Sequence, residues 1–431
     1  MHRLEKKKEE LFELGDELFL HPELGYKEFT NKKILSEYFE RNGLKVEELG
    51  FRTAFKVSIG SGYPHIGLIA ELDAIPTLGH PFANKDDNNA AHSCGHSTQC
   101  AIMAYTLVRL KDVLKKGRVT LYFTPAEEFT DIPFRKQLIK KKEINYIGGK
   151  VNMLSAGQFD DEDLLIHLHT MGQGNYHFSL NTSLSGFIYK EITFKGVASH
   201  AAVAPHNGVN ALNAFVLFDN AMNMLRETFK EEDYIRIHGM VAEGGQTVNS
   251  IPSRVVYECY VRSMNQKALK ETAERVDNAA KCCAKAIGAD VSIKSTPGYL
   301  PMHQSRLIND VIRKNMLKHC ELKDIHDDEI SMAAGDIGDI SCFKPTVQFG
   351  YSGFSGNCHG KDLCIVDKNR AYLEPAEVVF DTVTYLASHQ EYVDRIKKEF
   401  KPSMTKQEYL EYLKRCVAFR IDRETKHCAG K

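Results

Sequence analysis

The fold is decided by residues 65–76, which read HIGLIAELDAIP. The first half of this stretch is apolar enough to form a buried strand, and two acids, Glu71 and Asp73, follow at its carboxyl end. A polar loop then leads to a Cys-Gly-His triplet at 94–96, where an amphipathic helix expected over 97–116 begins. Because ligands of open α/β sheets collect beyond the carboxyl ends of the strands, acids and a thiol–imidazole pair at this place predict a metal site.

Three further apolar strands, expected at 118–124, 164–169 and 345–350, also lead to residues of the kinds that bind metals. Strands that alternate with helices predict an α/β layered fold, in which such strand ends meet at one edge. Taken singly, a carboxylate pair is more often surface charge and a histidine more often structural, so only the recurrence favours a site. The residues concerned are Glu127 and Glu128, His169, and His359.

The ligand types indicate the metals and the chemistry that the site suits. Thiolate, imidazole and carboxylate together suit zinc, or manganese or cobalt where oxygen ligands dominate. At a strand-to-loop turn the adjacent Glu127 and Glu128 can have different roles. One would bind metal, and the other would act as general base beside the water that the metal activates.

Composition excludes other classes of function. The chain has 431 residues and a net charge of −1, which gives no reason to expect nucleic acid or anionic membranes as partners. No apolar run approaches the roughly 18 residues of a membrane span, and the charged start of the chain lacks the features of a signal peptide. The 11 scattered cysteines are typical of reduced thiols. We therefore expect a cytoplasmic enzyme.

A second domain is predicted inside the first. From residue 187 the pattern changes to β-α-β-β-α-β, the order of the ferredoxin-like fold, and the first pattern resumes after residue 297. We expect an inserted α+β domain at 187–297 and one α/β domain built from 1–186 and 298–431. The elements expected in the insertion are a strand at 188–194, a helix at 208–230, strands at 233–242 and 254–264, a helix at 266–287 and a strand at 289–295.

Three runs of residues carry a resemblance to a known family. Residues 71–76, 92–96 and 124–128 resemble the amidohydrolase branch of the aminoacylase/carboxypeptidase-like dinuclear metallopeptidases. This branch includes hippurate hydrolases, auxin-conjugate hydrolases and aminobenzoyl-glutamate hydrolases. The resemblance covers roughly residues 10–390, and its further matching runs lie at 21–25, 163–169, 196–205 and 249–252.

The resemblance implies a fold and an activity. The fold would be a three-layer catalytic domain with a mostly parallel mixed sheet, and the inserted domain would serve as a lid and as the interface of a homodimer. Each subunit would hold two divalent ions, zinc or manganese in the first place and cobalt or nickel as alternatives. The reaction would be hydrolysis of the amide bond of an N-acyl, aroyl or aminoacyl amino acid, or of a dipeptide-like molecule, by metal-activated water.

Roles for single residues follow from the same resemblance. Cys94, as a thiolate, would bridge the two ions, Glu127 would be the general base, and Asp73 would orient a ligand. His169 is favoured as a ligand over His167, which precedes it by two residues on the same strand face, although both remain candidates. The full set of implied ligands is Cys94, His96, Glu128, His169 and His359.

The inserted domain would supply contacts to the substrate. His200 resembles the family histidine that polarises the substrate carbonyl, either within its own subunit or across a dimer. Asn249 and Arg262 resemble a pair that binds a substrate carboxylate. The chain departs from the family at Ser97 and Gln99, where Asp and often His are usual, and so lacks a carboxylate near the metals.

Other functions remain open. The same centre would serve a dipeptidase or a deaminase of small aromatic amines, and the change at Ser97 also fits an inactive relative that only binds metal or ligand. The loop at 77–89 and the basic stretch at 129–147, interpreted as an inserted helical hairpin, flank the expected pocket. The charged tail at 403–431 reads as helical and is assigned no chemistry.

Overall fold

The structure, a computed structural model, describes residues 2–418. Within these residues the chain forms two compact units. Unit 1 comprises 2–183, 303–330 and 339–403, and unit 2 comprises 184–302, 331–338 and 404–418. The main part of unit 2 thus begins and ends within a few residues of the insertion expected at 187–297.

Unit 1 is built on one large sheet. Its strands are β1 Val46–Glu48, β2 Phe55–Ser61, β3 His65–Glu71, β6 Gly117–Thr124, β7 Leu164–Thr170, β8 Phe178–Leu180, β14 Ile325–Asp327 and β16 Thr346–Tyr351. They lie in the order β1-β2-β6-β3-β7-β16-β8-β14, and the central pairs β6–β3, β3–β7 and β7–β16 are parallel. Antiparallel pairing of β1 with β2, β2 with β6 and β8 with β16 makes the sheet mixed. The mostly parallel α/β prediction is therefore confirmed.

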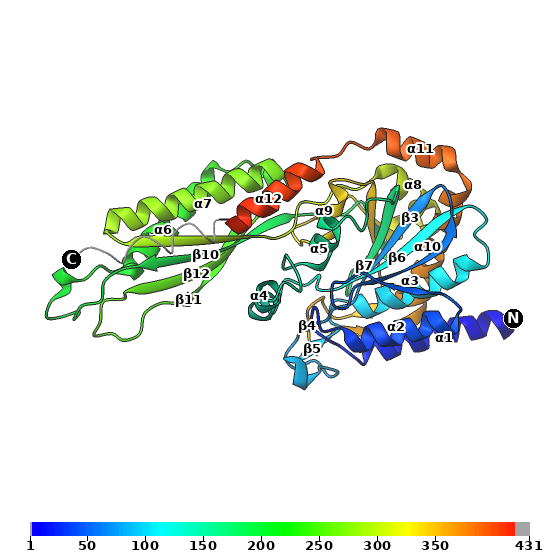
Figure 1. Cartoon of the computed structure of the whole chain (residues 1–431), viewed down its shortest axis with the longest axis horizontal. Coiled ribbons are helices and arrows are strands. Elements are labelled where there is room, and N and C mark those ends of the chain that lie inside the picture. The colour runs from blue at the N-terminus through cyan, green and yellow to red at the C-terminus, as the bar shows by residue number, and fades with distance from the viewer. Residues whose placement is uncertain (1, 419–431) are drawn as a thin grey trace. The chain divides into compact units, whose positions relative to one another are not determined.

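Helices flank this sheet (Figure 1). They are α1 His2–Phe19, α2 Phe29–Arg41, α3 His96–Lys111, α4 Ile132–Lys140, α5 Gly149–Ser155, α8 Arg306–Met316, α10 Glu374–Ser388 and α11 Gln390–Glu399. Helix α3 contacts α1 and α10, and α10 contacts α8. Buried side chains from α1, α2, α3, α8, α10 and α11 form one continuous core with one face of the strands.

Strand β6 shows that both faces of the sheet are covered. Val119, Leu121 and Phe123 belong to the core shared with α1, α3 and α10. Tyr122 points to the opposite face and packs edge-on against Phe159, which follows α5. Because successive side chains of a strand alternate between faces, a strand buried on both must lie between two covering layers.

Helix α3, which begins at the last residue of the Cys-Gly-His triplet, is buried nearly throughout. Every residue from His96 to Leu107 is buried, as expected for a helix in the interior of a large domain. The helix ends at Lys111 rather than at 116, because residues 112–116 turn the chain so that Gly117 can begin β6.

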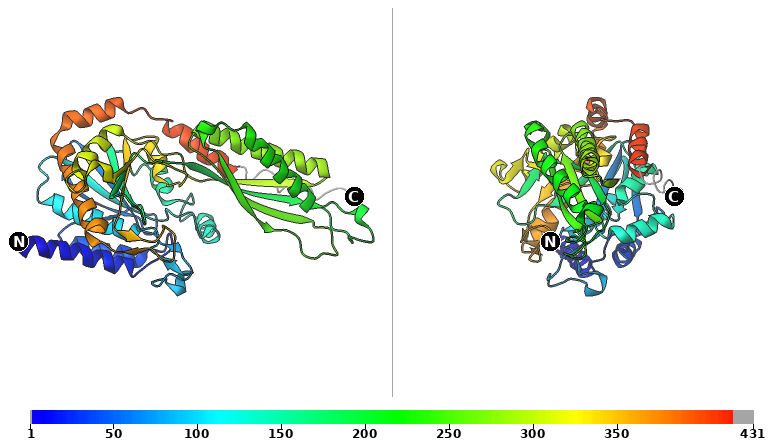
Figure 2. Two further views of the ribbon diagram at one scale, coloured as in Figure 1. Left: turned by 180° about the vertical axis from the view of Figure 1, so that it is seen from behind. Right: turned by 90° about the vertical axis from the view of Figure 1, so that its left-hand side faces the viewer.

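Unit 2 is a separate antiparallel structure. Its elements are β10 Gly186–Lys195, α6 Ala211–Leu225, β11 Arg236–Glu243, β12 Arg254–Ser263, α7 Gln266–Ile287, β13 Asp290–Pro297 and α12 Lys406–Ala418. The strand order β11-β12-β10-β13, with every pair antiparallel, is that of the ferredoxin-like fold and confirms the prediction. Helices α6 and α7 lie side by side over this sheet (Figures 1 and 2), above a core that includes Ile192, Phe218 and Val276.

The C-terminal helix packs within unit 2. Helix α12 contacts β13, and the ammonium group of Lys270 on α7 lies 5.1 Å from the ring centre of Tyr412. Tyr409 and Leu413 are fully buried. The sequence pattern predicts a helix in the tail at 403–431, of which 419–431 lie outside the described residues, but it gives no sign that the apolar side chains of α12 cover unit 2.

Short elements shape the connections. They are β4 Ile75–Pro76, β5 Ala90–Ala91, β9 Ser183–Leu184, β15 Ile330–Ser331, α9 Ile337–Ser341, β17 Phe354–Ser355 and β18 Cys364–Ile365. The stretch 129–147 holds the single helix α4 and not the expected hairpin. Its second half forms turns, because the side-chain oxygen of Asn152 accepts the N–H groups of Asn145 and Tyr146. Within residues 2–418 no helix has both the length and the apolarity to cross a membrane.

Candidate metal centre

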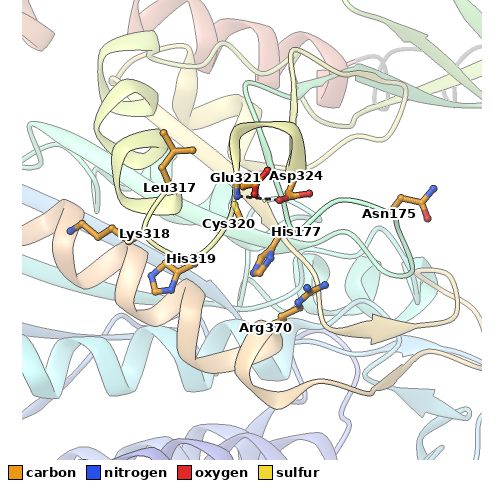
Figure 3. Close-up of a pocket in the computed structure, with 9 residues that line it drawn as sticks. All are labelled: Asn175, His177, Leu317, Lys318, His319, Cys320, Glu321, Asp324 and Arg370. Atoms are coloured by element: carbon orange, nitrogen blue, oxygen red, sulfur yellow. Dashed lines mark hydrogen bonds between the residues drawn. The ribbon is translucent and has the colours of Figure 1, made fainter.

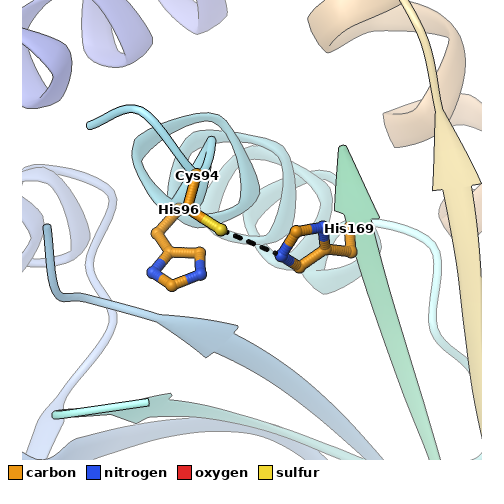
Figure 4. A group of neighbouring side chains, drawn as sticks. All are labelled: Cys94, His96 and His169. Atoms are coloured by element: carbon orange, nitrogen blue, oxygen red, sulfur yellow. Dashed lines mark hydrogen bonds between the residues drawn. The ribbon is translucent and has the colours of Figure 1, made fainter. Parts of the chain in front are cut away.

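The Cys-Gly-His triplet turns the chain into α3 close to the end of β7. Gly95 has a φ of 77°, in the left-handed region, and a side chain there would meet Thr170 at 2.5 Å. Glycine therefore lets the two flanking side chains reach the ends of the strands. Figure 4 shows the thiol of Cys94 directed at His169 on β7, with the ring of His96 beside it.

Cys94 is shared by two groups of potential metal ligands. Its Sγ atom lies 3.4 Å from Nε2 of His169 and 3.3 Å from Nε2 of His359. Nε2 of His359 also lies 3.0 Å from Oε1 of Glu128. Within each group the ligand atoms lie within 4.8 Å of one another; the groups are Cys94, His96 and His169, and Cys94, Glu128 and His359.

Asp73 fixes the backbone and one ring of this cluster. Its two carboxylate oxygens accept the N–H groups of Glu127 at 3.0 Å and of Glu128 at 2.9 Å. Its backbone carbonyl accepts Nδ1–H of His96 at 2.8 Å. Because a carbonyl oxygen only accepts hydrogen bonds, Nδ1 of His96 carries the proton and Nε2 faces the other ligands.

The adjacent glutamates both point to the same place. Ala126, just before them, has a φ of 55°, and this left-handed turn prevents the alternation that a strand would impose. Oε2 of Glu127 lies 3.9 Å from Nε2 of His96. The ligand atoms of His96, Glu127 and Glu128 lie within 4.8 Å of one another, so Glu127 lies at the edge of both groups.

The two candidate histidines of β7 have different surroundings. Nε2 of His169 faces Cys94, and its Nδ1–H donates to the carbonyl of Thr170 at 2.7 Å. Nε2 of His167 instead lies 3.3 Å from Oε1 of Glu71. Among the described residues only His169 of this pair joins a ligand group with Cys94.

The charge balance of the cluster favours a bound cation. Burial and the carboxylate of Glu128 raise the pKa of the Cys94 thiol well above its usual value. Burial lowers the pKa of His169 to about 4, whereas the hydrogen bond to Glu128 raises the pKa of His359. A nearby metal ion would offset the carboxylates and convert the thiol into a thiolate ligand.

An unsatisfied atom supports the same conclusion. Nε2 of His96 is buried and has no hydrogen-bond partner among the described residues. Burying such an atom without a partner is costly, and a metal ion beside it would satisfy it. The donor set of thiol, imidazoles and carboxylates therefore fits divalent ions.

The contact residues expected in unit 2 lie in two places. A hydrogen bond of 2.9 Å from the N–H of Ala201 to the carbonyl of Asn249 joins the loops that carry His200 and Asn249. Arg262 lies at the other end of β12, where its guanidinium donates to the carbonyl of Met332 at 3.1 Å. At about 3.4 Å per residue along the strand, the two places are roughly 25 Å apart. Within one chain, Asn249 and Arg262 therefore do not meet at one carboxylate.

Sequence reasoning missed two buried groups beside the cluster. Lys150 of α5 is fully buried, with Nζ 2.6 Å from Oε1 of Glu71. Glu28, just before α2, is also fully buried and accepts the N–H of Ala126 at 2.9 Å. A single charged residue in a helical pattern is nearly always at the surface, so no local signal distinguishes these two.

A cavity of about 460 Å³ lies elsewhere in unit 1 (Figure 3). Its charged groups are partly paired within the protein, Lys318 with Asp381 at 2.7 Å and His177 with Glu374. None of the predicted site residues lines it, so it is not the candidate centre. The lining residues are Asn175, His177, Leu317, Lys318, His319, Cys320, Glu321, Asp324 and Arg370.

Curated relatives are about a quarter identical to this chain over the aligned residues. The Xaa-Arg dipeptidase of Mus musculus is 27% identical over 68% of this chain and 64% of its own length. One of the subunits of the p-aminobenzoyl-glutamate hydrolase of Escherichia coli is 26% identical over 69% of this chain and 60% of its own length. The matches thus span less than two thirds of either relative. The N-acetyl-L-cysteine deacetylase of Bacillus subtilis is 25% identical over 69% of each chain.

Solved structures share the fold. A protein from methicillin resistant Staphylococcus aureus, described as a putative aminohydrolase, matches with a TM-score of 0.73 at 19% identity, over 89% of this chain and 98% of its own. A Bacillus subtilis protein, described as a dinuclear metal binding peptidase of the M20 family, matches with a TM-score of 0.68 at 18% identity, over 89% and 99%.

A match over residues 67–383 identifies the family of this chain. Residues 67–383, which include Cys94, Glu127, His169 and His359, match the family described as Peptidase family M20/M25/M40. This match covers more than half of the chain and begins at the strand that precedes Glu71. The resemblance found in the motifs is therefore confirmed, and the chain belongs to Peptidase family M20/M25/M40.

Proposed function

We propose that this protein is a metal-dependent amidohydrolase that cleaves the amide bond of an N-acyl amino acid. The observation that carries the proposal is the position of Cys94, whose Sγ is common to two ligand groups beside the carboxylate of Glu127. Relatives named for deacetylation of N-acetyl-L-cysteine and hydrolysis of p-aminobenzoyl-glutamate support the substrate class.

The metal site would hold two divalent ions. Cys94 would lie between them, with His96 and His169 on one side and Glu128 and His359 on the other. The thiol and imidazoles favour zinc, and the carboxylates also suit manganese. When bound, such ions lower the pKa of water and polarise a carbonyl group.

Glu127 would move the proton. Its carboxylate lies beside His96 and is not needed as a ligand in either group that shares Cys94. It would take a proton from the attacking water and return it to the nitrogen of the leaving amine. Asp73 would keep Glu127 and Glu128 in place through their backbone N–H groups.

We further propose a homodimer formed through unit 2. Several large apolar side chains of α6 and β11 are exposed there, as is usual for a surface that another protein covers; they are Val216, Leu217, Met224, Met240 and Val241. His200 would polarise the substrate carbonyl and Arg262 would bind a carboxylate. Because these two lie at opposite ends of β12, we propose that they serve one substrate molecule from different subunits.

A dipeptidase is the second candidate. The match to the Xaa-Arg dipeptidase of Mus musculus, at 27% identity, favours it. A dipeptide and an N-acyl amino acid share the amide bond and the free carboxylate, so the same centre would serve both. They differ in the free amine, which requires an acidic partner in the pocket.

Metal analysis joined to a substrate panel tests the proposal. Purified protein is reconstituted with zinc or manganese and assayed on N-acetyl and N-benzoyl amino acids and on dipeptides with a C-terminal arginine. About two ions per chain and hydrolysis of either group support an amidohydrolase, and the preferred group decides between the candidates. Protein that binds no stoichiometric metal, or binds two ions and hydrolyses nothing in the panel, would point to an inactive relative.

A further inference from the structure

A buried carboxylate outside the expected ligand set faces the candidate centre. Glu71, the last residue of β3, is 2% exposed, and its Oε2 atom lies 3.2 Å from Nε2 of His96. Its carboxylate also lies within 4.8 Å of that of Glu127. Neither of the ligand groups that share Cys94 uses it, so its position requires a separate explanation.

Lys150 and Gln99 hold the carboxylate of Glu71 in one orientation, and Nε2 of His167 also lies 3.3 Å from its Oε1 atom. Nζ of Lys150 lies 2.6 Å from Oε1. The side-chain amide of Gln99 donates to Oε2 at 2.9 Å, and its oxygen accepts the N–H of Glu71 at 3.3 Å. Burying an ion pair costs more free energy than it usually returns, which makes stability alone a weak reason for this arrangement. The partners do, however, keep Oε2 directed at His96.

The contact between Glu71 and His96 is unfavourable without a positive charge between them. Nδ1 of His96 carries a hydrogen, because it lies 2.8 Å from the carbonyl oxygen of Asp73. On a neutral ring Nε2 then presents a lone pair, which faces the negative oxygen of Glu71 at 3.2 Å and has no hydrogen-bond partner among the described residues. A proton on Nε2 would turn this contact into an ion pair, and a metal ion shared by the two atoms would remove the repulsion as well. Ligand atoms on one tetrahedral ion lie about 3.3 Å apart when each bond is about 2.0 Å.

We propose that Glu71 is a further carboxylate of the metal site, held by Lys150 and Gln99 so that it and His96 face the same ion. The inference rests on the proposed function, because it requires a metal beside His96. It also gives a role to Gln99, whose side-chain amide holds the carboxylate of Glu71, whereas the nearby Ser97 provides no carboxylate.

Metal affinity of two Glu71 variants tests the proposal. Glu71→Asp keeps the charge opposite Lys150 but withdraws the oxygen from His96, and Glu71→Gln removes the charge. Zinc affinity is measured on the full chain by competition with a chromophoric chelator, and thermal unfolding is measured on the metal-free protein. The absorption spectrum of the cobalt-loaded protein reports directly on the ligands of the ion. Glu162→Gln is the matched control, because Glu162 is also buried and hydrogen-bonded, to the hydroxyl of Tyr122 at 2.7 Å, but precedes the opposite end of β7.

The expected result is a 10- to 100-fold loss of affinity for one of two ions in both Glu71 variants, the range typical of residues that support a metal site. The cobalt spectrum should change, while metal-free unfolding of Glu71→Asp and all properties of Glu162→Gln should remain those of the wild type. If Glu71→Gln does not fold, the metal affinity of Glu71→Asp alone tests the proposal. If the wild type binds two ions and Glu71→Asp binds them equally well, this inference is overturned and the proposed function remains intact. Wild type that binds no metal overturns both.

Discussion

The carboxylate of Glu28 holds the backbone of Ala126, nearly a hundred residues further along the chain, with Oε1 accepting its N–H at 2.9 Å. The other oxygen accepts the hydroxyl of Thr53 at 2.5 Å. Ala126 has a φ of 55°, which is strained for a residue with a side chain. The bond from Glu28 therefore helps to hold the turn that directs Glu127 and Glu128 toward the metal site.

This relationship predicts an unusual dependence of stability on pH. Burial and the charge of Asp73 raise the pKa of Glu28 to about 8. Between its unfolded value near 4.5 and about 8, the folded protein binds a proton that the unfolded chain has released. This contribution to the free energy of unfolding is thus fully present at low pH and is lost as the pH rises through that window.

Glu28→Gln isolates the effect. Denaturant unfolding of the metal-free protein from pH 4.5 to 9 should show a smaller fall in stability for the variant than for the wild type, by on the order of a few kcal/mol. Glu23→Gln is a suitable control, because Glu23 is also hydrogen-bonded to backbone, at Thr30 and Asn31, without a resolved role at the centre. Parallel curves for wild type and Glu28→Gln would show that Glu28 does not carry the proton.

Substitution of Glu127 should lower turnover, whereas substitution of Glu128 should lower the metal content. Glu127→Gln removes the proposed general base and leaves the ligand groups that share Cys94 unchanged, so turnover should fall 10²- to 10⁴-fold while the metal content stays the same. Glu128→Gln should instead lower the metal content, because Oε1 of Glu128 lies among the ligand atoms beside His359. Elemental analysis and initial rates on the same samples distinguish the two. Near-normal hydrolysis by Glu127→Gln would show that Glu127 is not the general base.

Much of unit 1 could be predicted because its signals are local. The apolar run of β3 followed by Asp73, and the triplet that begins α3, are each readable over a dozen residues. Parallel strands then bring their carboxyl ends to one edge, so His169 and Glu128 could be expected near Cys94 without knowing any contact. The ferredoxin-like unit was predictable for the same reason, since its amphipathic strands and helices alternate in a fixed order.

Other features depend on contacts that no local pattern records. Lys150 is buried only because Glu71 lies opposite it, and the pair is 79 residues apart in sequence. The apolar residues of α12 indicate a buried face but not which unit covers it. The family resemblance implied that Asn249 and Arg262 act as a pair, yet the extended strand between them places them at opposite ends of β12.

Cys94 should be the one residue whose loss affects both ions. Its Sγ atom belongs to both ligand groups, so Cys94→Ser should reduce the metal content from about two ions per chain to less than one. Cys358→Ser is the matched control, because Cys358 precedes His359 and is partly buried but belongs to neither group. Retention of one tightly bound ion in Cys94→Ser would mean that the thiol serves only one of the two positions.

Mixed dimers should reveal which subunit supplies His200. His200 and Asn249 lie roughly 25 Å along β12 from Arg262, so one chain is not expected to bring all three to one substrate. A His200→Ala chain and a Cys94→Ala chain, co-expressed with different affinity tags and purified as a heterodimer, would each be inactive as homodimers. If His200 acts across the dimer, the heterodimer holds one complete site, with Cys94 from one chain and His200 from the other, and should recover about half of wild-type activity. If His200 acts within its own chain, every site in the heterodimer lacks one of the two residues, and the activity should stay at the level of the homodimeric variants.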